Sequence, residues 1–116
     1  MSADILIGNK VILKTSSGVF ETLYYELRDI IDDKKDFISS EIEEFIDIME
    51  VYKQGGCYFY IDKYITTSKG VSELLNLMKQ AIMQLKNQFP QSVISSLMAF
   101  CQDLQQYGDN LAKYAK

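Results

Sequence analysis

The sequence predicts a mainly helical α+β fold, with four helices, a C-terminal antiparallel helical hairpin and a small antiparallel sheet. Apolar residues recur at alternating spacings of three and four along four long segments, which is the period of amphipathic helices. Two other segments, 4–15 and 57–66, are rich in the β-branched and aromatic residues that favour strands. A chain of 116 residues with 47% apolar composition fits one domain, residues 1–116, with its own core. An all-helical bundle with frayed strand segments is the alternative.

The sheet is expected to combine both ends of the first half of the chain. Within segment 4–15, Gly8-Asn9 supplies a turn that tolerates positive φ and divides the segment into two short strands. Segment 57–66 follows the double glycine Gly55-Gly56, which ends the preceding helix. We expect this segment to form a strand that pairs with the first two.

The first two helices are predicted over about residues 19–32 and 36–52. Ser16-Ser17-Gly18 offers a start for the first helix, and Ser40 with Glu43 fits a capping box that could mark the true start of the second. The apolar stripe of the first helix consists of Phe20, Leu23, Leu27 and Ile30. The stripe of the second consists of Ile38, Ile42, Phe45, Met49 and Tyr52.

The last two helices are predicted over about residues 70–89 and from Pro90 onward. Pro90 suits the first turn of a helix, and the apolar spacing persists past Gly108, so the last helix could continue there. The stripe of the third helix consists of Val71, Leu75, Met78, Ile82, Leu85 and Phe89. The stripe of the fourth consists of Val93, Leu97, Phe100, Leu104, Tyr107, Leu111 and Tyr114. The two stripes predict an antiparallel hairpin with an internal seam, and a dimer seam is the less favoured alternative.

Charge is distributed unevenly along the chain. The segment from Glu26 to Glu50 holds ten of the sixteen acidic residues and three basic ones, so it carries −7. Residues 51–116 hold seven lysines and four acidic residues, so they carry +3. Such a separation bears on what the surface attracts rather than on the fold. The acidic half therefore predicts a positively charged partner.

The residue types argue against most catalytic and cofactor-binding classes. The chain has no histidine, which removes the commonest general base and metal ligand, and no phosphate-binding glycine loop occurs. The clustered carboxylates point away from the apolar stripe, so an inward-facing metal site is not expected. With a net charge of −4 and Arg28 as its single arginine, the chain does not resemble a nucleic-acid binder. We expect no enzyme activity, no metal and no cofactor.

The compartment expected from the sequence is the cytoplasm. The N-terminus lacks the positive region of a signal peptide, and no stretch approaches the roughly 18 apolar residues needed to span a membrane. The two cysteines, Cys57 and Cys101, fit no metal-ligand spacing. We expect both to be reduced and buried thiols.

The outward flank of the second predicted helix mixes carboxylates with branched apolar residues. A helical wheel places its acidic residues away from the buried stripe, together with Ile48 and Val51. Protein interfaces combine charge complementarity with a desolvated apolar centre, and Tyr25 on the first helix could add an aromatic anchor. The predicted partner-binding residues are Tyr25, Glu26, Asp29, Asp32, Glu43, Glu44, Asp47, Ile48, Glu50 and Val51. The competing interpretation is an ordinary solvated surface, with Ile48 packed under the 57–66 strand.

In size, charge and layout, the whole chain resembles the immunity proteins of bacterial contact-dependent growth-inhibition toxins and nuclease bacteriocins. The resemblance implies a cytoplasmic inhibitor of a cognate toxin, and a nuclease toxin would offer a basic cleft to the carboxylates. The first alternative is an acidic secretion chaperone that binds an effector segment as a homodimer. The second is a structural subunit or regulator that docks through residues 90–116.

Overall fold

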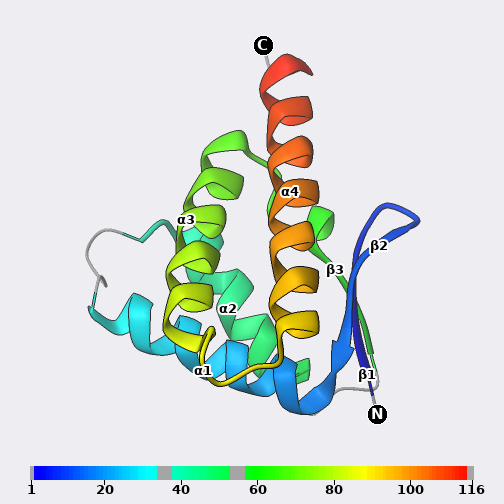
Figure 1. The fold of residues 1–116 in the computed structure, drawn as a ribbon. Coiled ribbons are helices and arrows are strands. Elements are labelled where there is room, and N and C mark those ends of the chain that lie inside the picture. Colours follow the sequence, from blue (N-terminus) through cyan, green and yellow to red (C-terminus); the bar gives the residue numbers. More distant parts are fainter. Residues whose placement is uncertain (1, 34–37, 53–56, 115–116) are drawn as a thin grey trace.

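The computed structural model describes residues 2–33, 38–52 and 57–114, and it has the mainly helical α+β fold that the sequence predicts (Figure 1). The elements, in chain order, are β1 (Ser2–Ile7), β2 (Lys10–Ser16), α1 (Ser17–Asp33), α2 (Ser40–Tyr52), β3 (Cys57–Tyr60), a 3-10 turn η2 (Ile61–Lys63), α3 (Ser68–Leu85) and α4 (Gln91–Tyr114). Helices α3 and α4 stand side by side across α1 and α2, and the sheet lies on the other side of α4 (Figure 1). The Cα radius of gyration is 13.3 Å.

The three strands form a mixed sheet in the order β2-β1-β3. Strands β1 and β2 pair antiparallel through the turn at Gly8, whose φ of 59° confirms the expected turn. Strand β3, however, pairs parallel to β1, so the prediction of a purely antiparallel sheet is wrong. The chain leaves β2 at the end of the sheet where Ser16 faces Ser2, and after two helices it enters β3 at the same end, where Cys57 faces Ala3. The new strand must therefore run in the direction of β1.

Only the first part of segment 57–66 is a strand. After Tyr60 the chain turns into η2, and the amide N–H groups of Tyr64 and Ile65 both donate to the Ile61 carbonyl at 2.9 Å. Ile61 and Ile65 are fully buried. The strand prediction fails for residues 61–66 because the chain turns at Ile61, and the hydrogen bonds of this turn replace the pairing to a neighbouring strand.

The starts of α1 and α2 both differ from the predicted residues. Helix α1 begins two residues earlier than predicted, and the Ser16 hydroxyl accepts the Val19 amide hydrogen at 3.2 Å. Helix α2 begins at Ser40, the residue that the capping-box pattern marks, so the predicted start at residue 36 is wrong. Residue 36 itself lies outside the described residues.

The boundaries of α3 and α4 also differ slightly from the prediction. The Thr67 side chain caps α3 by accepting the Gly70 amide hydrogen at 3.0 Å, which moves the start to Ser68. Helix α3 ends at Leu85 rather than at residue 89, and the Gln88 and Phe89 amide N–H groups both donate to the Leu85 carbonyl. Helix α4 follows Pro90 and continues without a break through Gly108.

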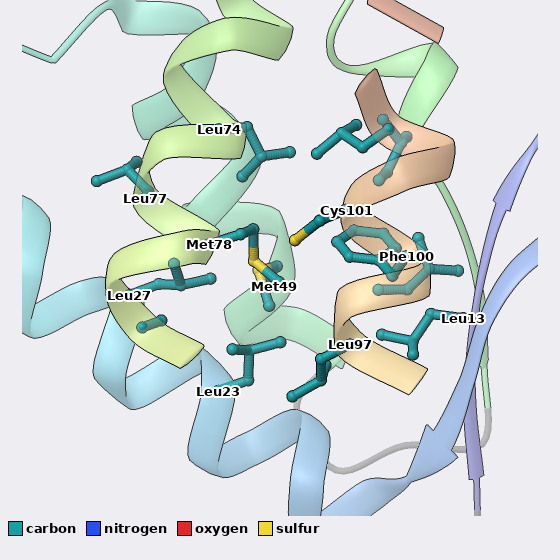
Figure 2. Packing of buried hydrophobic residues seen from close by; sticks show 14 of the residues in the cluster. Leu13, Leu23, Leu27, Met49, Leu74, Leu77, Met78, Leu97, Phe100 and Cys101 are labelled. Carbon is teal, nitrogen blue, oxygen red and sulfur yellow. The ribbon is translucent and has the colours of Figure 1, made fainter. Parts of the chain in front are cut away.

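The core is one cluster of apolar side chains contributed by the sheet and by the four helices (Figure 2). Phe59 of β3 connects its parts: its ring lies 5.1 Å from that of Phe45 on α2, 6.3 Å from that of Phe20 on α1 and 5.4 Å from that of Tyr64. Phe59 is 1% exposed. Packing of this kind adds directional aromatic contacts to the hydrophobic burial.

The α3–α4 hairpin has the internal seam that the apolar spacing predicts. Leu97, Phe100 and Leu104 of α4 are buried, and so are Val71 and Met78 of α3. A dimer seam on α4 would need these α4 side chains at the surface, and the hairpin already covers them.

Gly108 explains how the two helices approach closely at the open end of the hairpin. A Cβ atom on Gly108 would lie 2.7 Å from Cγ1 of Val71, closer than carbon atoms pack. The helical glycine therefore has a packing role that outweighs its low helix propensity.

Replacing Phe59 with alanine is expected to lower the free energy of unfolding by about 3–5 kcal/mol, because three aromatic neighbours lose their shared contact. Urea unfolding followed by circular dichroism measures the change. The matched control is Phe89→Ala, since Phe89 is only half-buried and its loss should cost clearly less. Equal losses for the two variants would contradict the central place of Phe59.

Gly108→Ala is expected to destabilise the protein by about 1–3 kcal/mol despite the better helix propensity of alanine, because the new methyl group overlaps Val71. Gly18→Ala is the control, since only the Ser16 hydroxyl lies near its Cβ position, at 4.0 Å. In a double-mutant cycle, Val71→Ala should recover part of the loss. If the free-energy changes of the two substitutions were simply additive, the two side chains would not compete for space.

Candidate functional site

The outward side chains of α1 and α2 form a surface that we call the acidic face. On α2, the buried side chains Ile42, Phe45, Ile46 and Met49 fix which side of the helix faces the core. Because a helix has 3.6 residues per turn, Glu43, Glu44, Asp47 and Glu50 must then point to solvent, and all four are exposed.

Arg28 of α1 lies at the junction of the two helices and binds the acidic side chains of α2. Its Nη2 atom donates to Oδ1 of Asp47 at 2.7 Å, and it lies 3.9 Å from Oε2 of Glu50. Its Nε atom donates to the Tyr24 hydroxyl at 3.3 Å, and the guanidinium lies 5.5 Å from the centre of the Tyr24 ring. The single arginine therefore joins α1 to α2 through Asp47 and Glu50, while its hydrogen bond and cation–π contact with Tyr24, within α1, orient the guanidinium.

These contacts also affect the protonation of Arg28. Burial by itself would lower the pKa of the guanidinium, but the hydrogen bonds to Asp47 and Tyr24 outweigh burial and raise the pKa. Arg28 is thus a permanent positive charge. It holds the carboxylates of Asp47 and Glu50 in place without neutralising the net negative charge of the acidic face.

A small cavity of about 30 Å³ shows that further acidic side chains belong to the same junction. Arg28, Asp32 and Glu43 line it, together with Ile31 and Ile38. Its size suits a single water molecule. We call Asp32, Glu43, Asp47 and Glu50, together with Arg28, the junction cluster. Four carboxylates and one guanidinium leave it with a net charge of −3.

Three of the other predicted partner-binding residues, Tyr25, Glu44 and Val51, are exposed beside this cluster. Val51 is 72% exposed and shares its flank of α2 with Glu44. Tyr25 is 49% exposed, and its ring lies 5.1 Å from that of Tyr24, which in turn contacts Arg28. Both side chains offer apolar area beside the carboxylates.

Three predicted residues are less well placed. Ile48 is half-buried and packs against the core, as the competing interpretation expects. Glu26 is half-buried and lies about 160° around α1 from Arg28, so it points away from the junction cluster. Asp29 is exposed but about 100° from Arg28, which places it at the edge of the face.

Glu41 is the acidic residue whose role the sequence did not indicate. Its carboxylate accepts hydrogen bonds from the Thr66 amide at 3.2 Å and from the Thr67 hydroxyl at 2.7 Å. It also lies against Gly70, where a Cβ atom would overlap it. Glu41 therefore anchors α2 to the start of α3 and does not belong to the acidic face. No spacing signal marks this role, since Thr66 and Thr67 are distant in sequence.

The described residues offer no other site of obvious chemistry. No group of three or more cysteine, aspartate and glutamate side chains among them is arranged to hold a metal ion. None of the helices in the described part of the chain has the length and apolar character to cross a membrane. Cys101 is a free, buried thiol, whereas the side chain of Cys57 lies outside the described residues.

Comparisons with known proteins give no match. No protein-family model fits the chain, and neither a curated protein nor a solved structure is significantly similar to it. The function must therefore be argued from the chain's own residues.

Replacing Arg28 with glutamine is expected to lower the free energy of unfolding by about 1 kcal/mol at low salt, because Asp47 and Glu50 then repel without a cation between them. The loss should shrink in high salt, where the repulsion is screened. Urea unfolding at two NaCl concentrations measures both effects.

Lys10→Gln is the control for this variant. The Lys10–Asp103 pair is longer, at 3.5 Å, and the Lys10 side chain is 71% exposed, so its loss should be close to neutral. If Arg28→Gln were as neutral as Lys10→Gln at low salt, Arg28 would not be holding the two helices together.

Proposed function

We propose that the protein is an immunity protein that binds a cognate bacterial toxin domain and neutralises it through the acidic face. The observation that carries the proposal is the junction cluster, in which Arg28 of α1 holds two exposed carboxylates of α2 and lines a small cavity with Asp32 and Glu43. Like charges gathered at a surface repel one another, and a positively charged partner would offset that cost.

The arrangement suits a nuclease toxin in particular. A nuclease binds the phosphates of its substrate in a basic cleft, and a row of fixed carboxylates can occupy that cleft in their place. Because Arg28 holds Asp47 and Glu50 in position, less side-chain freedom is lost on binding. Electrostatic steering would raise the association rate towards the order of 10⁸ M⁻¹s⁻¹ at low salt.

Apolar groups beside the carboxylates supply the second requirement of an interface. Val51 and Tyr25 are large apolar side chains that remain exposed at the edges of the face. Tyrosine is one of the residues most often found at sites of high binding energy, and Val51 would add apolar contact area beside the carboxylates. The inhibitor would act in the cytoplasm, where a nuclease toxin meets its substrate.

The secretion-chaperone alternative has less support. It relied on the α4 stripe as a homodimer seam, and Leu97, Phe100 and Leu104 of that stripe are covered within the chain. The acidic face, in contrast, is exposed and available to a partner.

Reversing the charge of the face should abolish protection against the toxin. The toxin is taken as the product of the adjacent gene, or as the protein that co-purifies from the native host. We expect Glu43→Lys combined with Asp47→Lys to weaken binding by at least about a hundredfold, because charge pairs at such interfaces couple strongly. Calorimetry and survival of toxin-expressing cells measure the effect.

Asp109→Lys is the matched control, since Asp109 is exposed on α4, away from the face. Glu44→Lys, on the flank of Val51, tests how far the interface extends. Undiminished binding and protection by the Glu43/Asp47 variant would rule out the proposed face. If the captured partner were a secreted effector rather than a toxin, the secretion-chaperone alternative would be favoured.

A further inference from the structure

A second surface, opposite in charge to the acidic face, lies on the α3–α4 hairpin. The two helices enclose an open groove of about 640 Å³ along their outer side. Its floor is formed by Leu75 and Ile82 of α3 and by Ile94 and Cys101 of α4. Figure 2 shows the Cys101 side chain directed from α4 towards α3. The seam between the helices is thus accessible from one side.

Two methionines at the sides of this groove are largely exposed to solvent. Met83 of α3 is 62% exposed and Met98 of α4 is 55% exposed. Neither belongs to the apolar stripes that build the core. Methionine is flexible and polarizable, and surfaces that receive amphipathic helices use it because it adapts to the partner's side chains.

The rims of the groove carry positively charged and polar side chains. Lys79 and Lys86 line the α3 side, both exposed, and Gln102 and Gln105 line the α4 side. Among the residues that the structure describes, no acidic side chain lines the groove. The two lysines are seven residues apart, so they lie on one side of α3 about 10 Å apart along the helix axis. An occupant with negative charges at a similar spacing would match them.

A second copy of this chain does not fit these charges. In a symmetric dimer the same surface meets itself, so four lysines would gather in an interface to which the described lining residues contribute no carboxylate. Docking of the acidic face into the groove of the next copy would be head-to-tail, and such contacts build rings or open filaments rather than a dimer.

A single acyl chain is also a poor match. Its one carboxylate could reach one of the two lysines, and the groove is too open to bury most of a small ligand, as ligand pockets do. A helix lying along the groove would cover Met83 and Met98 and reach both lysines at once.

We propose that the α3–α4 groove binds an amphipathic helix of a partner protein, one that presents an apolar stripe to the groove and two acidic residues about seven positions apart to Lys79 and Lys86. Anchors at spacings of three, four and seven are how a helix fills such a groove. The site is separate from the acidic face and does not depend on the toxin-binding proposal.

Synthetic peptides test the proposal directly. The probe is a helical peptide of about four turns, with leucines along one face and glutamates seven positions apart beside it. The matched peptide carries lysines in place of the glutamates. We expect the glutamate peptide to bind at least about tenfold more tightly in fluorescence anisotropy at low salt.

Charge exchange identifies the two lysines as the partners. Lys79→Glu with Lys86→Glu should reverse the preference, so that the lysine peptide binds more tightly. Lys69→Glu is the matched control, since it makes the same change on α3 outside the groove lining and should leave the preference intact. Circular dichroism verifies that each variant is folded. Equal binding of the two peptides, or a preference that does not reverse, would overturn the proposal.

Alkylation of Cys101 locates the binding site on the unmodified protein. Cys101 lies in the groove floor and is 8% exposed. Burial raises its pKa, partly opposed by the Lys79 ammonium, so alkylation should be slow and should accelerate with rising pH. Peptide mapping by mass spectrometry distinguishes Cys101 from Cys57. The glutamate peptide should slow alkylation at Cys101, and unchanged alkylation would place the peptide elsewhere.

Two further outcomes would assign the groove differently and overturn the proposal. Protection of Cys101 by laurate but not by the glutamate peptide would indicate an acyl-chain site. Concentration-dependent dimerisation that Lys79→Glu and Lys86→Glu abolish would indicate an interface between copies of this chain. The Glu43/Asp47 charge reversal should leave peptide binding intact, so failure of this proposal is distinguishable from failure of the toxin-binding proposal.

Discussion

The arrangement of the first half of the chain depends on the aromatic contacts of the Phe59 side chain. It projects from β3 into the helical layer and meets aromatic rings from α1, α2 and the turn after η2. Strand β3 in turn is fixed beside β1 by parallel pairing, with Phe59 opposite Ile5. The two acidic helices are therefore tied to the sheet at one buried point. Their orientation follows from that attachment together with the hydrogen bonds of Glu41 to Thr66 and Thr67.

Once α1 and α2 are packed in this way, the helical period decides where the charges lie. Burial of one side of α2 forces its carboxylates onto the other side, and Arg28 gathers Asp47 and Glu50 towards α1. The resulting junction cluster is negative and ordered. The groove between α3 and α4, in contrast, is lined by lysines, with no acidic side chain in the described part of its lining. The charge separation of the sequence thus becomes two surfaces of opposite sign on different helix pairs.

Much of the fold could be predicted because the helices follow simple periodicity. The apolar spacing identified all four helices and the internal seam of α3 and α4, since burial of one stripe dominates the energetics of each helix. The direction of β3 could not be predicted in the same way. It depends on where two consecutive helices return the chain, which is a tertiary property. The turn at Ile61 could not be predicted, because the β-branched and aromatic composition of residues 57–66 is typical of a strand and carries no signal for a 3-10 turn.

The candidate site was predictable in composition but not in detail. Exposure of Glu43, Glu44, Asp47 and Glu50 follows from the wheel of α2 alone. The bridge from Arg28 does not, because it joins residues nineteen apart on two helices whose packing the sequence leaves open. Glu41 shares the same acidic segment and yet acts as an internal anchor. The α3–α4 groove is not among the predicted sites, although the positions of Met83 and Met98 outside the apolar stripes are a sequence signal for it.

The most direct test of the central claim is the salt dependence of binding between this protein and its captured partner. Stopped-flow measurements would give the association rate constant from about 20 to 300 mM NaCl, a range over which the screening length shortens severalfold. If the acidic face meets a basic surface, the rate constant should fall by at least about tenfold over this range. A rate constant that hardly changes would mean that the carboxylates of α1 and α2 do not direct the encounter, and the proposed mode of binding would be wrong.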